Sequence, residues 1–105
     1  MASIKIEHRH ALSSSEAKNR LQALGDYLSR RHGVNVAWTS ENSASVRGKY
    51  LIVNIEGKVE LAEGSIRFEG KDPGVLWRSK AKKYLEGKLA QYFSANTPLG
   101  SLPRG

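Results

Sequence analysis

The stretch Ile4-Lys5-Ile6-Glu7-His8-Arg9-His10-Ala11-Leu12-Ser13-Ser14-Ser15-Glu16-Ala17 decides the fold class, because a strand, a stop and a capped helix follow one another in it. Ile4 and Ile6 alternate with charged residues, which is the period-2 pattern of a strand with one buried face. Ser13 and Glu16 have the spacing of a capping box. The stretch therefore predicts a strand that leads directly into a helix capped by Ser13.

The residues that follow predict where this helix packs and where it ends. Apolar residues recur at helical spacing and predict one buried stripe; they are Ala17, Leu21, Leu24 and Leu28. Basic residues at 30–32 suit the negative end of a helix dipole, and Gly33 can adopt the left-handed conformation of a C-cap. We therefore expect the helix to end near His32. Gly25 inside it indicates close backbone packing.

The central part of the chain predicts a run of antiparallel strands joined by short turns. Period-2 alternation over 34–39 predicts a second strand, and a polar turn follows at 39–43. Apolar residues from 44 to 55 predict either one long strand or two strands separated at Gly48, where a bulge is a further option. Glu56-Gly57-Lys58 and Glu63-Gly64 predict two tight turns, with strands over 59–61 and 66–68.

A second helix is predicted from Asp72-Pro73 to about Phe93, with the aspartate as its cap and the proline in its first turn. Its apolar stripe should pack on the sheet and consists of Trp77, Ala81, Leu85, Leu89 and Tyr92. The fold class is therefore α+β: an antiparallel sheet of four to five strands with both helices on one face, in the order β-α-β-β-β(-β)-α. We expect one domain over 1–94 and a flexible tail over 95–105, where Pro, Gly and Ser show no periodicity.

Composition and charge limit the classes of function that the protein can have. The 105 residues include no cysteine and carry a formal net charge of +7. This charge either favours an anionic partner or, on the second helix, serves solubility alone. No apolar run is long enough to span a membrane, and no signal peptide precedes the first strand, so we expect a cytoplasmic protein. The candidate residues for contact with a partner or an anion are Lys71, Arg78, Lys80, Lys82 and Lys83 on or next to the second helix, and Lys49, Lys58 and Arg67 on strands.

The sequence offers little for catalysis. His8 and His10 share one face of a strand, but no carboxylate or thiol at a suitable spacing completes a metal site. We expect His10 to hydrogen-bond the loop that enters the first helix. Three serines at 13–15 are explained by capping, and the glutamates fall at turns or at solvent-facing strand positions. The sequence therefore predicts a protein that is not an enzyme, with no cofactor and no metal.

Several of these motifs together resemble the polyhydroxyalkanoic acid system family. They are the Ile-x-Ile strand, the step His10-Ala11-Leu12-Ser13, the acidic start of the helix at Glu16-Ala17 and the strand Val34-Asn35-Val36-Ala37-Trp38. The resemblance covers about residues 3–93. The chain departs from it over 62–75, where the family usually carries a leucine-rich stretch and this chain is polar. The resemblance implies association with polyester storage granules or with their proteins, and it brings no catalytic residues.

The leading hypothesis is thus a non-enzymatic accessory or binding protein associated with polyhydroxyalkanoate storage granules. Its contact surfaces would be the cationic second helix and the polar face of the sheet. Val75, Leu76 and Phe93 flank the buried stripe of this helix, and they either form an apolar contact element or complete the core. The main alternative is a nucleic-acid-binding module that contacts phosphates through the basic C-terminal helix. A small-ligand carrier with a cavity between sheet and helices is a third reading. An exposed strand edge or sheet face also leaves homo-oligomerisation open.

Overall fold

The elements of the fold follow the predicted order. The computed structural model describes residues 3–50 and 53–104. The elements are β1 (Ser3–Arg9), α1 (Ser14–His32), β2 (Asn35–Trp38), β3 (Ser43–Tyr50), β4 (Val53–Ala62), β5 (Ser65–Lys71), α2 (Val75–Tyr92) and a short 3-10 helix, η1 (Leu99–Ser101). This order confirms the α+β class. Residues 51 and 52, which the apolar pattern assigns to a strand, lie outside the described residues.

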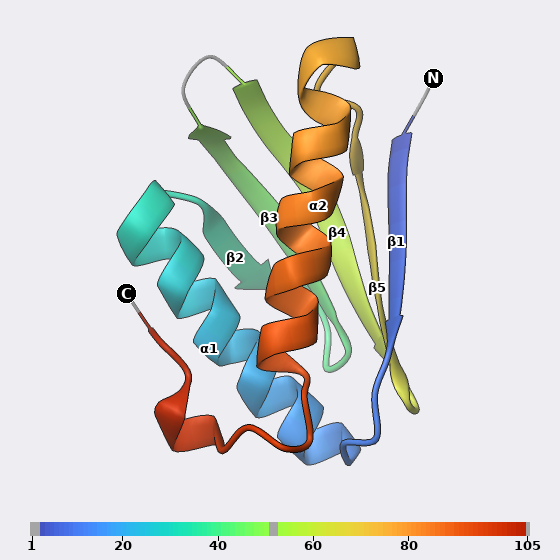
Figure 1. Cartoon of the computed structure of the whole chain (residues 1–105), viewed down its shortest axis with the longest axis vertical. Helices are drawn as coiled ribbons and strands as arrows, with labels where there is room; N and C mark the ends of the chain where they lie inside the picture. The colour runs from blue at the N-terminus through green and yellow to red at the C-terminus, as the bar shows by residue number, and fades with distance from the viewer. Residues whose placement is uncertain (1–2, 51–52, 105) are drawn as a thin grey trace.

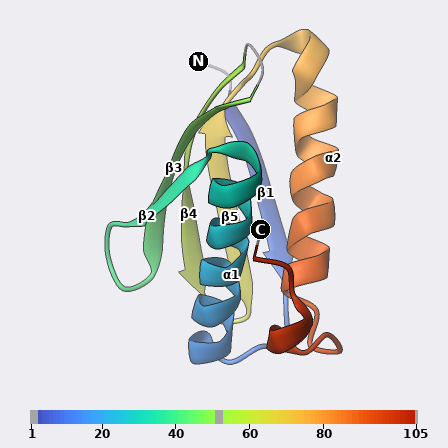
Figure 2. The ribbon, with the colours of Figure 1, turned by 90° about the vertical axis from the view of Figure 1, so that its left-hand side faces the viewer.

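The five strands form one antiparallel sheet in the order β1-β5-β4-β3-β2. Strands β2 to β5 form a meander, and β1 pairs with β5, so β1 and β2 are the two edges. Both helices lie on the same face of this sheet, as predicted (Figures 1 and 2). The opposite face is left uncovered by the described elements, and we call it the open face.

Helix α1 begins and ends where its local signals predict. The Ser13 hydroxyl oxygen accepts the backbone N–H of Glu16 at 3.2 Å, which satisfies one of the N–H groups left unpaired by the first turn. Gly33 takes the left-handed conformation with φ of 68°, and its N–H bonds to the Ser29 carbonyl at 3.1 Å. The packing expected of Gly25 is confirmed, because a Cβ there would lie 3.2 Å from that of Val36 in β2.

The predicted hairpin at Glu56-Gly57-Lys58 is wrong. These residues lie inside β4, where Gly57 pairs with Gly70 of β5. A Cβ on either glycine would come within 3.0 Å of the Phe68 ring, so the two glycines make room for this buried side chain on the inner face of the sheet. Gly48 is neither a break nor a bulge, because the β3–β4 register runs through it without interruption.

Helix α2 starts later than the sequence predicts. Its cap residue is Gly74 and its first residue is Val75, so Asp72 and Pro73 lie before the helix. The Asp72 carboxylate still accepts a backbone N–H, that of Gly74, at 2.8 Å. This bond and an ion pair with Arg78 fix the entry into the helix without a side-chain cap.

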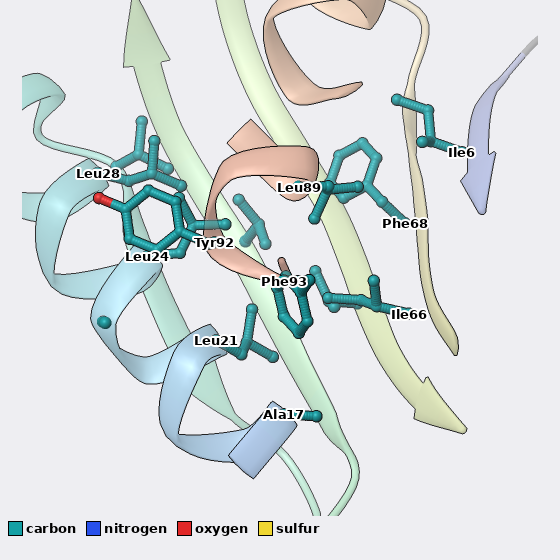
Figure 3. Close-up of a cluster of buried hydrophobic side chains, with 14 of the residues drawn as sticks. Ile6, Ala17, Leu21, Leu24, Leu28, Ile66, Phe68, Leu89, Tyr92 and Phe93 are labelled. Atoms are coloured by element: carbon teal, nitrogen blue, oxygen red, sulfur yellow. The ribbon is translucent and has the colours of Figure 1, made fainter. Parts of the chain in front are cut away.

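The core lies between the sheet and the two helices. Its largest fully buried side chains are Tyr92, Phe93 and Ile66. Figure 3 shows them between the leucines of α1 and the inner faces of β1 and β5. Trp38 is half-buried against this core. Trp77, which the sequence assigns to the apolar stripe of the second helix, is also half-buried but is not part of the core cluster.

Residues 94–104 pack back onto the helical layer. Leu102 is 6% exposed and belongs to the core, and the Tyr92 hydroxyl donates to the Pro103 carbonyl. Arg20 of α1 is buried; its guanidinium donates to the carbonyls of Tyr92, Ser94 and Thr97 at 3.2, 2.7 and 2.5 Å. The division into a domain over 1–94 and a flexible tail stays a prediction. These contacts favour an ordered segment.

Candidate functional site

The eight cations predicted to contact a partner lie on two different sides of the molecule. Arg78, Lys80, Lys82 and Lys83 are on α2, and Lys71 ends the strand that leads toward it. Lys49, Lys58 and Arg67 project from the open face of the sheet, away from both helices, and Lys71 alternates onto this same face of β5. The structure therefore does not join these residues into one basic patch.

The open face carries charges of alternating sign. Along β1, β4 and β5 cations and anions alternate at every second residue, and across these three strands opposite charges face one another. Arg67 donates to Glu7 at 2.8 Å, Lys5 lies 3.8 Å from Glu69, and Lys58 lies 3.6 Å from Glu60. The Arg67 hydrogen bond holds the pKa of Glu7 below its ordinary value. Lys58 and Arg67 are therefore neutralised by neighbours and are poorly placed for phosphate contact.

A shallow hollow of about 510 Å³ lies on this open face. It is lined by Lys5, Ile6, Glu7, Lys58, Glu60, Arg67, Phe68 and Glu69, which come from β1, β4 and β5. Equal numbers of acids and bases line it, so it has no preference for either sign of charge. The space between sheet and helices, where a carrier would hold its ligand, is filled in the described part of the chain by core side chains (Figure 3).

The cations of α2 differ in what they contact. Arg78 binds Asp72 at 2.6 Å and, with the Gly74 N–H, lowers the pKa of that carboxyl, so Arg78 has a structural role at the helix start. The Lys80 ammonium lies 5.6 Å from the centre of the Trp77 ring, within the range of a cation–π contact. Lys82 and Lys83 are exposed, and in the described ranges neither has an ion-pair partner.

The apolar element predicted beside these cations is only partly present. Phe93 is 1% exposed, so its place on a contact surface is wrong; it ends α2 and fills the core beneath it. The side chain of Val75 lies outside what the structure describes. Leu76, in contrast, is 84% exposed. The first turn of α2 thus presents a solvated leucine next to the half-buried Trp77, with Lys80 and Lys83 one and two turns further along the same face.

Of the two histidines at the end of β1, His10 has contacts that stabilise the fold. His10 Nδ1 accepts the backbone N–H of Leu12 at 3.1 Å, which confirms the predicted link into the helix, and its ring lies 5.5 Å from that of Phe93. Burial, with a smaller effect of His8, lowers the pKa of His10 and favours the uncharged form of the ring. Within residues 3–50 and 53–104 no group of three or more His, Cys, Asp or Glu could hold a metal ion.

Sequence reasoning missed Arg20 and the cluster that joins the two helices. Arg20 falls on the buried stripe of α1 four residues after Glu16, with which it forms an ion pair at 3.1 Å. A charge on an apolar stripe with an i,i+4 partner is the signal that could have identified it. In the second case, the Tyr84 hydroxyl lies 3.1 Å from His32 Nε2, and the Lys88 ammonium lies 4.2 Å from the Tyr27 ring centre. Both groupings hold the helical layer together.

These features define a two-layer α+β protein in which helices cover one face of an antiparallel sheet and the other face is charged and open. The chain belongs to the family described as putative polyhydroxyalkanoic acid system protein, whose model matches residues 4–96. This match confirms the resemblance drawn from the sequence. No curated protein and no solved structure matches the chain.

The match includes the polar segment 62–75, which the resemblance drawn from the sequence set apart. Strand alternation accounts for this polarity. Ile66 and Phe68 are buried on the inner face of β5, while Arg67 and Glu69 project from the open face. No helix in the described part of the chain is long and apolar enough to cross a membrane.

Proposed function

We propose that this protein is a non-enzymatic, cytoplasmic accessory protein of polyhydroxyalkanoate storage granules, and that it contacts the granule surface through the first turns of α2. Family membership supports the link to the storage system. A non-enzymatic role is supported by the structural use of the polar groups considered above. His10, Ser13 and Asp72 bind backbone N–H groups, and the glutamates of the open face pair with neighbouring bases.

The observation that carries the proposal is the exposure of Leu76. An exposed leucine leaves apolar surface in contact with water, which is unfavourable, and it does not stabilise the folded monomer. A polyester surface is apolar, and a leucine and a tryptophan flanked by lysines form the combination by which amphipathic helices hold such surfaces. Leu76, Trp77, Lys80 and Lys83 provide this combination within two turns of α2.

Co-sedimentation with native granules tests this proposal. The wild-type protein should pellet with the granules, and Leu76→Glu should leave most of the protein in the supernatant. Ala90→Glu is the matched control, because it adds the same charge to the outward side of α2 four turns away from Leu76 and should pellet like the wild type. Wild-type protein that stays in the supernatant, or a Leu76→Glu variant that still pellets, would contradict the proposal.

A nucleic-acid-binding module is the second candidate, and it is favoured by the unpaired lysines Lys82 and Lys83 on α2. Binding through phosphate contacts would fall steeply as salt is raised, because each contact releases counterions. DNA or RNA retention should then be lost in Lys82→Gln/Lys83→Gln and unchanged in Leu76→Glu. Absence of retention at low salt would remove this candidate.

A further inference from the structure

Strand β1 is an edge of the sheet, and its outer side meets no other described element (Figure 1). In an antiparallel pair the N–H and C=O of one residue point to the same side, and this side alternates along the strand. The His10 N–H donates to the Gly64 carbonyl of the β4–β5 turn at 2.9 Å, continuing the β1–β5 register. Even-numbered residues therefore bond to β5, and the backbone groups of Ser3, Lys5, Glu7 and Arg9 face outward.

The outward-facing positions are also those that carry charge. Lys5, Glu7 and Arg9 are exposed, while Ile4 and Ile6 point into the core. A free strand edge attracts a further strand, and proteins commonly block it with lysine. Here Lys5 is followed two residues later by Glu7. The edge can therefore pair with a strand that places opposite charges across from these two residues.

From this placement we infer that β1 pairs antiparallel with β1 of a second copy of the chain, which would form one continuous sheet. Hydrogen bonding restricts such a pair to registers in which odd-numbered residues face odd-numbered residues. Among the central registers, one places Lys5 opposite Lys5 and another places Glu7 opposite Glu7. Only the register centred on Ile6 places Lys5 opposite Glu7 twice, once on each side of the two-fold axis.

The charge pattern of the open face continues across the interface between the two β1 strands. In each copy Glu7 is bonded to Arg67 and Lys5 lies against Glu69. Across the interface the charged side chains then follow in the order Arg67, Glu7, Lys5 of the second copy and Glu69 of the second copy. Their charges alternate in sign without interruption. Opposite charges directly across two strands stabilise a pair, and like charges destabilise it. The other edge, β2, has four residues against the seven of β1 and offers a shorter ladder.

Sedimentation velocity tests this interface by charge reversal. Wild-type protein should be dimeric at about 100 µM. Lys5→Glu and Glu7→Lys should each raise the dissociation constant at least about tenfold, because each variant places like charges opposite one another on both sides of the axis. The double variant Lys5→Glu/Glu7→Lys should restore the dimer. Arg47→Glu, which breaks the exposed Arg47–Glu56 pair away from β1, should leave it unchanged.

Cross-linking gives a test that does not depend on charge. The chain has no cysteine, so Lys5→Cys and Glu7→Cys can be prepared as separate variants. Facing residues of a hydrogen-bonded pair have Cα atoms about 5.5 Å apart, within the range of a disulfide. Oxidation of the mixture should give the mixed dimer, and either variant alone should give little. A monomeric wild type, a dimer insensitive to both reversals, or no mixed disulfide would overturn the inference.

Discussion

At the scale of single residues, His10 shows how a side chain that could bind a metal is instead used to build the fold. Its Nδ1 atom accepts the Leu12 N–H, and its ring packs near Phe93, so it connects the end of β1 to the start of α1. Its Nε2 atom is buried without a hydrogen-bond partner. This arrangement suits a neutral imidazole and opposes a charged one.

We therefore expect the protein to lose stability in mild acid. The pKa of His10 is lowered from 6.5 in the folded state, so the unfolded chain takes up this proton first as the pH falls. The free energy of unfolding should keep its full contribution from His10 above pH 6.5 and lose it as the pH falls through the folded pKa. Urea unfolding at about pH 7.5 and 5 measures the loss.

His10→Asn provides the control for this pH dependence. Asparagine keeps an oxygen that can accept the Leu12 N–H, but it does not titrate. His8 and His32 are unchanged in the variant. The loss of stability between the two pH values should be smaller in the variant; equal losses would show that His10 is not responsible.

At the scale of elements, β4 shows why a glycine between charged residues was misread as a turn. Glu56-Gly57-Lys58 has the composition of a hairpin, but the two charged residues project from the open face and Gly57 lies under the Phe68 ring. The space that this ring needs is set by residues from β4 and β5 together. No local pattern contains that information.

Gly57→Ala should lower the free energy of unfolding by about 1–3 kcal/mol, because the added methyl group meets the Phe68 ring and the backbone of β5. Gly87→Ala should have the opposite sign. Gly87 lies inside α2 with nothing within 4 Å of an added Cβ, so alanine should raise the free energy by about 0.5–1 kcal/mol. Chemical denaturation of both variants measures the difference, and a neutral Gly57→Ala would refute the packing explanation.

At the scale of the whole molecule, the residues after α2 pack against α1 and contribute to the core. Leu102 is part of the core, and the Arg20 guanidinium donates hydrogen bonds to three carbonyls at the end of α2 and in the segment after it. A buried arginine that loses such partners would be costly, so the segment and α1 stabilise each other.

Leu102→Ala should lower the free energy of unfolding by about 2 kcal/mol if the segment is docked. Leu76→Ala is the matched control, since Leu76 is 84% exposed against 6% for Leu102, and it should change stability by less than about 0.5 kcal/mol. Urea unfolding measures both variants. Equal and small effects would support the flexible tail predicted from the sequence.

The sequence by itself determined the order of the elements, both ends of α1, the β2 strand, the turn at Glu63-Gly64 and the placement of both helices on one face. These features depend on periodicity and caps, which neighbouring residues specify. Only the tertiary structure decided the role of Gly57, the burial of Phe93, and the neutralisation of Lys58 and Arg67. Most of these depend on residues brought together from distant parts of the chain, and a contact between distant residues leaves no mark in the local pattern of either one.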